Sequence, residues 1–158
     1  MTNSPIFCFD MDGTIADLYG VENWLPMIRA YDATPYREAK PLLNLSALAR
    51  QVNAAQRKGA KLVIISWASK DPDPGFFDDV LAAKAEWLAE HLPSVRWDEV
   101  FVTPYGRNKA MQCGVDSMNF HLFDDEQKNC HEWRCAGGWA HGPQSITEVL
   151  SDFNNGRL

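Results

Sequence analysis

Short apolar runs, each followed by polar residues, are the main feature of the hydrophobic pattern. Four runs are too short for helices and rich in branched and aromatic residues, which is typical of buried parallel strands. They span residues 5–9, 61–65, 99–103 and 119–123, and a shorter run at 137–140 is a candidate fifth strand. Apolar residues at helical spacing predict helices over about 21–28, 44–58, 77–92 and 146–153. Alternation of strands with helices predicts an α/β fold with a doubly wound, mostly parallel sheet.

One stretch interrupts this alternation soon after the first strand. The residues from Asp17 to Lys40 contain apolar positions at helical spacing and several aromatic side chains. Such a segment is too short to form its own core. We therefore expect a single domain, 1–158, with a minimal helical cap inserted at about 17–40, whose aromatic residues could roof a pocket. Two prolines within 71–75 predict a loop.

The size and charge of the chain narrow the classes of protein that it can be. Its 158 residues are 46% hydrophobic and include six Trp, as expected of a globular domain rather than a disordered one. No apolar run reaches membrane-spanning length and the N-terminus lacks the pattern of a secretion signal, so we expect a cytoplasmic protein without a membrane partner. The net charge of −6 argues against tight, general nucleic-acid binding. Nothing in the pattern indicates an oligomeric state.

The cysteines offer one alternative function, a structural zinc site. Cys130, His131, Cys135 and His141 lie close together in the sequence. Their spacings match none of the common zinc-ligand patterns, so this site stays a remote alternative.

Acidic residues follow two of the predicted strands directly. Asp10 and Asp12 come after the first strand, with Gly13 indicating a sharp turn, and Asp124 and Asp125 come after the fourth. Open α/β sheets bind ligands at the carboxyl ends of their strands. Clustered carboxylate oxygens there are typical ligands of Mg²⁺. A calcium loop does not fit, because Thr14 and Val21 would stand at its fifth and twelfth positions.

Paired carboxylates at such an edge suit phosphoryl transfer. One carboxylate can attack phosphorus, while its neighbour handles the proton of the leaving group and then activates water. Ser66 follows the second strand and could hold a phosphate oxygen. Lys109, in the loop after the third strand, could neutralise the nucleophile and the phosphate, although Arg107 competes for this role. A plain acidic turn, a strand-end serine and a solvated lysine are the alternatives for each signal taken alone.

In this order, Asp10-x-Asp12-Gly-Thr, Ser66, Lys109 and Asp124-Asp125 resemble the four motifs of the haloacid dehalogenase superfamily of phosphohydrolases. The resemblance covers about residues 6–138. It implies a sheet of order 5-4-1-2-3, Asp10 as nucleophile and Asp12 as general acid and base. It also implies that Lys109 neutralises charge, that Ser66 binds the phosphoryl group, and that Mg²⁺ is held by Asp124, Asp125, Asp10 and the backbone carbonyl of Asp12. Gly13 and Thr14 of the first motif are expected beside the substrate.

The substrate is indicated less directly. The stretches 84–88, 99–103 and 122–125 resemble the 5′(3′)-deoxyribonucleotidase branch, although the insert here is shorter than the cap of that branch. We therefore expect a small phosphorylated substrate, with a nucleotide as the leading candidate. Trp67 and Trp24 could stack on its base. A polynucleotide end phosphatase and a scaffold that binds a phosphorylated ligand without hydrolysis are the alternatives.

Overall fold

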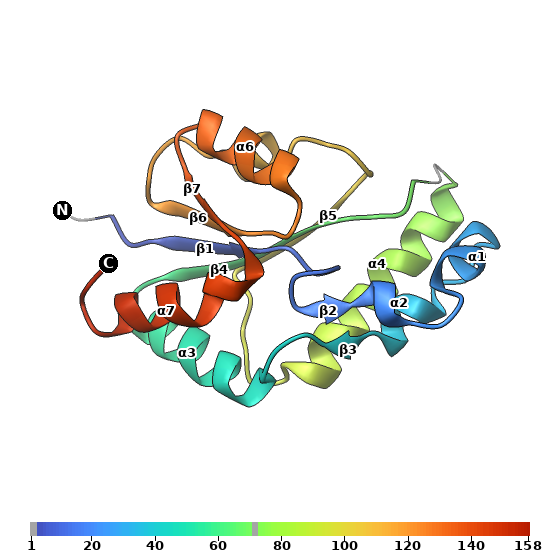
Figure 1. Cartoon of the computed structure of the whole chain (residues 1–158), viewed down its shortest axis with the longest axis horizontal. Coiled ribbons are helices and arrows are strands. Elements are labelled where there is room, and N and C mark those ends of the chain that lie inside the picture. The colour runs from blue at the N-terminus through green and yellow to red at the C-terminus, as the bar shows by residue number, and fades with distance from the viewer. Residues whose placement is uncertain (1–2, 71–72) are drawn as a thin grey trace.

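The computed structural model describes residues 3–70 and 73–158. Its strands form a five-stranded sheet of order β5-β4-β1-β6-β7, in which every neighbouring pair is parallel (Figure 1). The strands are β1 (Ile6–Phe9), β4 (Lys61–Trp67), β5 (Glu99–Thr103), β6 (Phe120–Phe123) and β7 (Trp139–His141). Numbered along the chain among themselves, these strands have the order 3-2-1-4-5. This is the order that the family resemblance implies, read from the opposite edge.

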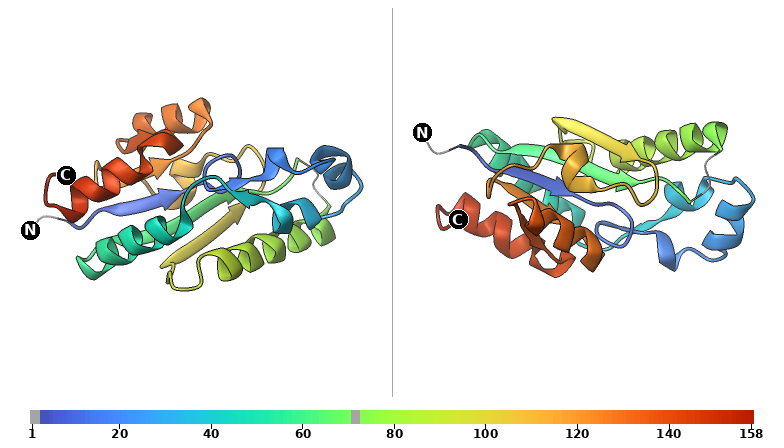
Figure 2. Two further views of the ribbon diagram at one scale, coloured as in Figure 1. Left: turned by 60° about the horizontal axis from the view of Figure 1, so that its bottom comes forward. Right: turned by 90° about the horizontal axis from the view of Figure 1, so that it is seen from above.

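Helices cover both faces of the sheet, as the two turned views show (Figure 2). They are α3 (Leu45–Arg57), α4 (Pro74–His91), α5 (Lys109–Cys113), α6 (Gln127–Cys135) and α7 (Ile146–Asn154), with short 3₁₀ turns at Leu18–Gly20 and Pro143–Ser145. None of the helices in the described ranges is long and apolar enough to cross a membrane. The doubly wound α/β fold expected from the sequence is confirmed.

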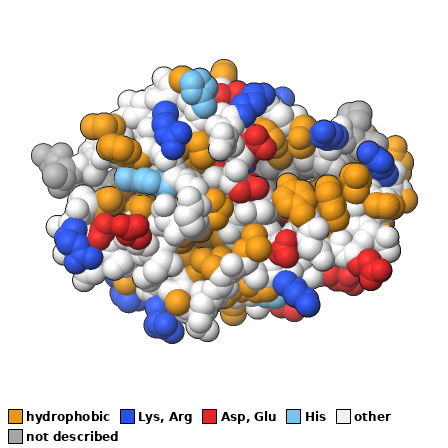
Figure 3. Space-filling model, viewed as in Figure 1, with side chains coloured by type: hydrophobic (Ala, Val, Ile, Leu, Met, Phe, Trp, Pro, Cys, Tyr) orange, Lys and Arg blue, Asp and Glu red, His pale blue; other side chains and the backbone are white. Residues whose placement is uncertain are grey.

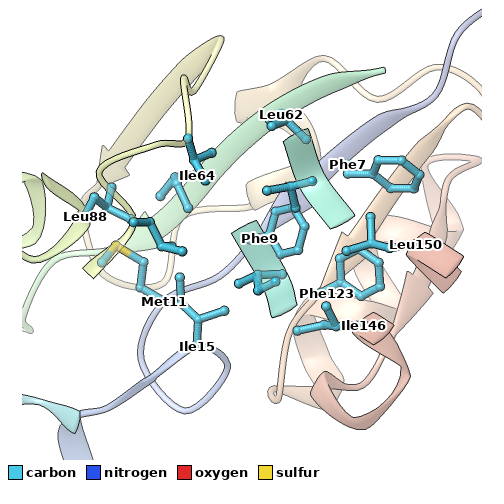
Figure 4. Close-up of a cluster of buried hydrophobic side chains, with 14 of the residues drawn as sticks. Phe7, Phe9, Met11, Ile15, Leu62, Ile64, Leu88, Phe123, Ile146 and Leu150 are labelled. Atoms are coloured by element: carbon cyan, nitrogen blue, oxygen red, sulfur yellow. The ribbon is translucent and has the colours of Figure 1, made fainter. Parts of the chain in front are cut away.

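Alternating side chains of each strand feed two separate cores. Phe7 and Phe9 of β1 pack with α3, α7 and the end of α4, together with Leu62 and Ile64 of β4 (Figure 4). Cys8 points to the opposite face, where it packs with residues of α5 and α6. Successive strand residues face opposite sides of the sheet, so these two cores bury both faces of β1. Packing on both sides fixes the position of the end of the strand. That end carries Asp10.

The insert is closed at its base by a small antiparallel ladder. β2 (Ala16–Asp17) pairs with β3 (Lys40–Pro41), so that Asp17 lies opposite Lys40. Between them, α1 (Trp24–Arg29) and α2 (Thr34–Glu38) lie against α4 at the end of the molecule away from the two termini (Figure 1). The insert shares its apolar cluster with α4. This cluster comprises Leu18, Ile28, Ala33, Tyr36, Ala68, Phe76, Val80 and Ala83.

Four local details differ from the sequence-based expectations. β4 continues to Trp67, so Ser66 lies inside the strand rather than after it. Lys109 is the first residue of a short helix, whose N-cap Asn108 accepts a hydrogen bond from the Met111 N–H at 3.1 Å. The helix α6 was not expected, because its sequence has little apolar periodicity. Of the predicted loop 71–75, residues 71 and 72 lie outside the described ranges, and α4 already begins at Pro74.

Candidate active site

The candidate site lies where two adjacent parallel strands end. Asp10 follows β1 and Asp124 follows β6, and these strands are neighbours in the sheet. The backbone N–H of Asp10 donates to Phe123 O at 2.9 Å, and that of Asp124 donates to His141 O at 3.1 Å. The ladder therefore fixes the backbone of both acids at one edge, as the sequence predicts.

Lys109 joins these two carboxylates. Its Nζ lies 2.8 Å from Oδ1 of Asp10 and 2.7 Å from Oδ2 of Asp124, and all three side chains are buried. Burial alone lowers the pKa of a lysine, but Asp10 and Asp124 outweigh it, and the pKa of Lys109 is raised. Lys109, and not Arg107, is therefore the cation at the acidic edge.

The other oxygen of Asp10 is held by Thr14. The Thr14 hydroxyl lies 3.0 Å from Oδ2 of Asp10 and 3.3 Å from Oδ1 of Asp125, and it accepts the Asp125 N–H at 3.2 Å. A hydroxyl has one hydrogen, so Thr14 donates to one of these two carboxylates at a time. Thr14 thus ties the turn after β1 to the turn after β6.

Asp124 and Asp125 both hold their protons more tightly than ordinary aspartates. Burial, followed by the neighbouring Asp10, raises the pKa of Asp124 to about 6, against the opposing effect of Lys109. Asp125 is exposed at the rim, yet partial removal from water and repulsion by Asp10 and Asp124 raise its pKa to about 7. The cluster therefore carries more negative charge than one lysine can balance.

This excess charge fits a divalent cation. Asp10, Asp124 and Asp125 each offer a carboxylate oxygen, and these oxygens lie within 4.8 Å of one another. In the ranges that the structure describes, this is the single group of three or more His, Cys, Asp or Glu ligands so arranged. All the donors are hard oxygens, which Mg²⁺ prefers. The residues present therefore fit a magnesium ion.

Gly13 allows the turn after β1 to pass close to Asp125. Its φ is +80°, and a Cβ added to it would stand 2.4 Å from Oδ2 of Asp125. A side chain at this position would be strained in the backbone and would collide with a candidate metal ligand. The turn predicted at Gly13 thus requires a glycine for both its conformation and the space available.

Asp12 pairs with a second buried lysine, Lys84 of α4. Lys84 Nζ lies 2.7 Å from Oδ2 of Asp12, and the two side chains are 1% and 17% exposed. The same ammonium donates to Ser66 Oγ at 2.6 Å and to Trp67 O at 2.7 Å. Burial raises the pKa of Asp12, while Lys84 opposes the shift.

A cavity of about 580 Å³ lies between this sheet edge and the insert. Its floor includes the carboxylates of Asp10, Asp12, Asp124 and Asp125, together with Lys109. Aromatic side chains form much of its walls: Tyr19, Trp24, Tyr36, Trp67 and Tyr105. In Figure 3, hydrophobic side chains gather between the acidic side chains in the middle of the view and the end that carries α1. The insert therefore roofs a pocket, as the sequence suggests.

The aromatic walls are joined to the charged floor. Trp67 lies with its ring 5.1 Å from Lys109 Nζ, and its indole N–H donates to Arg107 O at 2.8 Å. The ring of Tyr105 is 4.9 Å from that of Trp67. Trp67 thus reaches the pocket from the end of β4, and its stacking on a base stays a prediction.

Ser66 and the Cys/His group lie differently from the other candidates. Ser66 is fully buried and does not line the cavity, so its contact with a phosphoryl group stays a prediction.

The Cys and His residues of the zinc alternative have other partners. The buried thiol of Cys130 donates to Asp124 O at 3.5 Å. The ring of His141 stacks on that of His121, with Nδ1 of His121 and Nε2 of His141 3.2 Å apart. The four Cys and His residues are not gathered into one metal site among the described residues.

Lys84 is the site residue that the sequence analysis missed. It lies on the apolar stripe of α4, four residues after Val80 and four before Leu88, both of which are buried. A lysine in the middle of an apolar stripe needs a buried partner. This exception to the helical pattern is the signal that could have identified it.

Comparisons with known proteins bear on the fold. Neither a scan against models of protein families nor a search of curated proteins finds a match. Among solved structures, a D,D-heptose 1,7-bisphosphate phosphatase from Burkholderia thailandensis is similar, with a TM-score of 0.59 and 11% sequence identity, over 95% of this chain and 98% of that one. Another, from B. bronchiseptica and complexed with magnesium and phosphate, has a TM-score of 0.56 and 15% identity, over 92% and 86%. At these identities, the likeness shows a shared fold.

Proposed function

We propose that the protein is a Mg²⁺-dependent phosphomonoester hydrolase of the haloacid dehalogenase type that works through an aspartyl-phosphate on Asp10. The observation that carries this proposal is the arrangement of Asp10, Lys109 and Asp124, an acid–cation–acid contact at the carboxyl ends of β1 and β6. The fold also supports the haloacid dehalogenase assignment, because the similar structures are phosphatases and one holds magnesium and phosphate.

In the first step, a carboxylate oxygen of Asp10 attacks phosphorus, and the bond between phosphorus and the ester oxygen breaks. Lys109 places its positive charge beside the nucleophile throughout. Asp12, whose pKa is raised by burial, gives its proton to the departing oxygen. The products are an alcohol and a phosphate carried on Asp10.

In the second step, Asp12 takes a proton from water as that water attacks phosphorus. The acyl-phosphate bond breaks, releasing inorganic phosphate and restoring the carboxylate of Asp10. Magnesium, held by oxygens of Asp10, Asp124 and Asp125, would offset the negative charge of the phosphoryl group. A role for the backbone carbonyl of Asp12 as a further ligand belongs to the same proposal.

The pocket favours a substrate with a planar ring, and we take a nucleotide as the leading candidate. The aromatic walls support this choice because nucleobases stack on such side chains without regard to sequence. The named activity of the similar structures makes a sugar phosphate the natural comparison. A cavity of about 580 Å³ is of the size that holds one small molecule.

The reaction class is tested with p-nitrophenyl phosphate in Mg²⁺ or in chelator. Asp10→Asn should abolish turnover, because an amide does not attack phosphorus as the carboxylate does. Asp78→Asn, which changes an exposed acid of α4, is the matched control and should keep wild-type activity. Undiminished turnover by Asp10→Asn would contradict the mechanism, and binding of phosphate without hydrolysis of any ester would favour the scaffold alternative.

The substrate class is tested by comparing kcat/KM for nucleoside monophosphates, a heptose bisphosphate and a 5′-phosphorylated oligonucleotide. We expect the nucleoside monophosphates to be the best of the three. A clear preference for the sugar bisphosphate would contradict the nucleotide assignment, and a preference for the oligonucleotide would favour end processing.

A further inference from the structure

The ammonium of Lys84 is saturated with hydrogen bonds. Its three hydrogens match three acceptors: Oδ2 of Asp12 at 2.7 Å, Oγ of Ser66 at 2.6 Å and the carbonyl oxygen of Trp67 at 2.7 Å. These acceptors come from the turn after β1 and from the end of β4. One side chain of α4 therefore connects Asp12 to the next strand.

The surroundings of Lys84 hold it in one place. The residue is 1% exposed, and α4 packs against both the sheet and the insert. The ring of Tyr36, from α2, makes a cation–π contact with Nζ of Lys84, whose distance to the ring centre is 5.0 Å. A buried ammonium with three short contacts cannot turn away without losing them, so its position is set by the fold.

Lys84 and Lys109 serve different carboxylates. Lys109 contacts Asp10 and Asp124, whereas Lys84 contacts Asp12. Asp12 lines the cavity, and its Oδ1 accepts no hydrogen bond from the residues that the structure describes. With Oδ2 held by Lys84, Oδ1 is the oxygen left for a substrate.

We propose that Lys84 is a positioning residue that fixes Asp12 with Oδ1 directed at the leaving-group oxygen and, later, at the attacking water. This inference rests on the proposed function, since it assigns Lys84 to the acid–base half of that reaction. It predicts that losing Lys84 impairs proton transfer by Asp12 and leaves the attack by Asp10 largely intact.

The test compares two esters that differ in their need for an acid. p-Nitrophenolate leaves without protonation, whereas an alkoxide does not. In Lys84→Met, kcat/KM for an alkyl phosphate should fall by about tenfold to a hundredfold more than kcat/KM for p-nitrophenyl phosphate. The aryl ester should also give a burst of p-nitrophenol followed by slow turnover, because breakdown of the aspartyl-phosphate needs Asp12 as a base.

Two comparisons separate positioning from general damage. Lys61→Met removes a lysine from the far, exposed end of β4 and should leave both rates unchanged. Adding Lys84→Met to Asp12→Asn should lower the rates little further, since Lys84 acts through Asp12. If Lys84→Met does not fold, as judged by circular dichroism, Lys84→Gln is measured in its place and should show the same difference between esters in smaller degree.

The results distinguish failure of the positioning role from failure of the proposed function. Equal losses on both esters with an active wild type would overturn the positioning role and leave the proposed function standing. Absence of Asp10-dependent turnover in the wild type, on either ester, would overturn the proposed function and the role of Lys84 with it.

Discussion

Nζ of Lys109 lies 2.8 Å from Oδ1 of Asp10, inside the protein and 99 residues away along the chain. The contact joins the start of α5 to the end of β1. It gives the proposed nucleophile a fixed cation that solvent does not screen. The same ammonium contacts Asp124, so two buried carboxylates share one lysine.

Removing this charge should affect both activity and stability. Lys109→Met leaves two buried carboxylates without their cation, which costs about 3–5 kcal/mol of unfolding free energy when one partner of a buried pair is lost. The loss of charge stabilisation should lower kcat by at least about a hundredfold. Turnover of p-nitrophenyl phosphate and thermal unfolding measure the two effects, with Lys61→Met as the control. Wild-type kcat in a folded Lys109→Met protein would exclude the proposed role.

The close approach of Gly13 to Asp125 gives a steric prediction. In Gly13→Ala, the new methyl group would meet Oδ2 of Asp125 at 2.4 Å, so the carboxylate must move away from the metal cluster. We expect a higher Mg²⁺ concentration for half-maximal activity. Gly106→Ala is a matched control, because Gly106 has a φ of +82° but nothing within 4 Å of the added Cβ. Equal Mg²⁺ requirements in the two variants would assign the effect to backbone strain alone.

The acids of this site could be predicted because they follow strands. An apolar run that ends in Asp10 or in Asp124 fixes both the element and the edge, and parallel pairing then brings the ends together. The order of the four motifs places Lys109 at this edge. The helix that Lys109 begins is not predicted, since five residues are too few for a periodic pattern.

Ser66 and Lys84 show where the sequence was insufficient. β4 is two residues longer than its apolar run, and Ser66 points to the same face as Leu62 and Ile64, toward α4. Side chains alternate between the two faces only as far as the strand continues, and the apolar run does not show where β4 ends. The pairing of Lys84 with Asp12 spans 72 residues and exists only once α4 has packed on the sheet.

The aromatic wall predicts a selective loss of nucleotide binding. Tyr105 is half exposed at the pocket and contacts Trp67, and within the described ranges it forms no hydrogen bond with an acidic residue. Tyr105→Ala should therefore raise KM for a nucleoside monophosphate by about tenfold, the effect of losing one stacking partner, with little change in kcat. KM for a ring-free alkyl phosphate serves as the internal control. A parallel rise in both KM values would argue against stacking.

Protons and Mg²⁺ should compete for the acidic cluster. The pKa of Asp124 is raised to about 6 and that of Asp125 to about 7, and a carboxyl must be ionised to bind the metal. Mg²⁺ affinity, measured by calorimetry, should therefore rise by about tenfold or more between pH 5.5 and 7.5 and then level off.

The stability of the metal-free protein should change in the opposite direction, falling as the pH rises. Because these groups bind protons more tightly in the folded than in the unfolded protein, their contribution to stability is complete below about pH 4 and is lost as the pH rises through 6 to 7. Asp125→Asn should flatten the upper part of that loss, and an unchanged pH profile of unfolding in this variant would show that Asp125 does not titrate there.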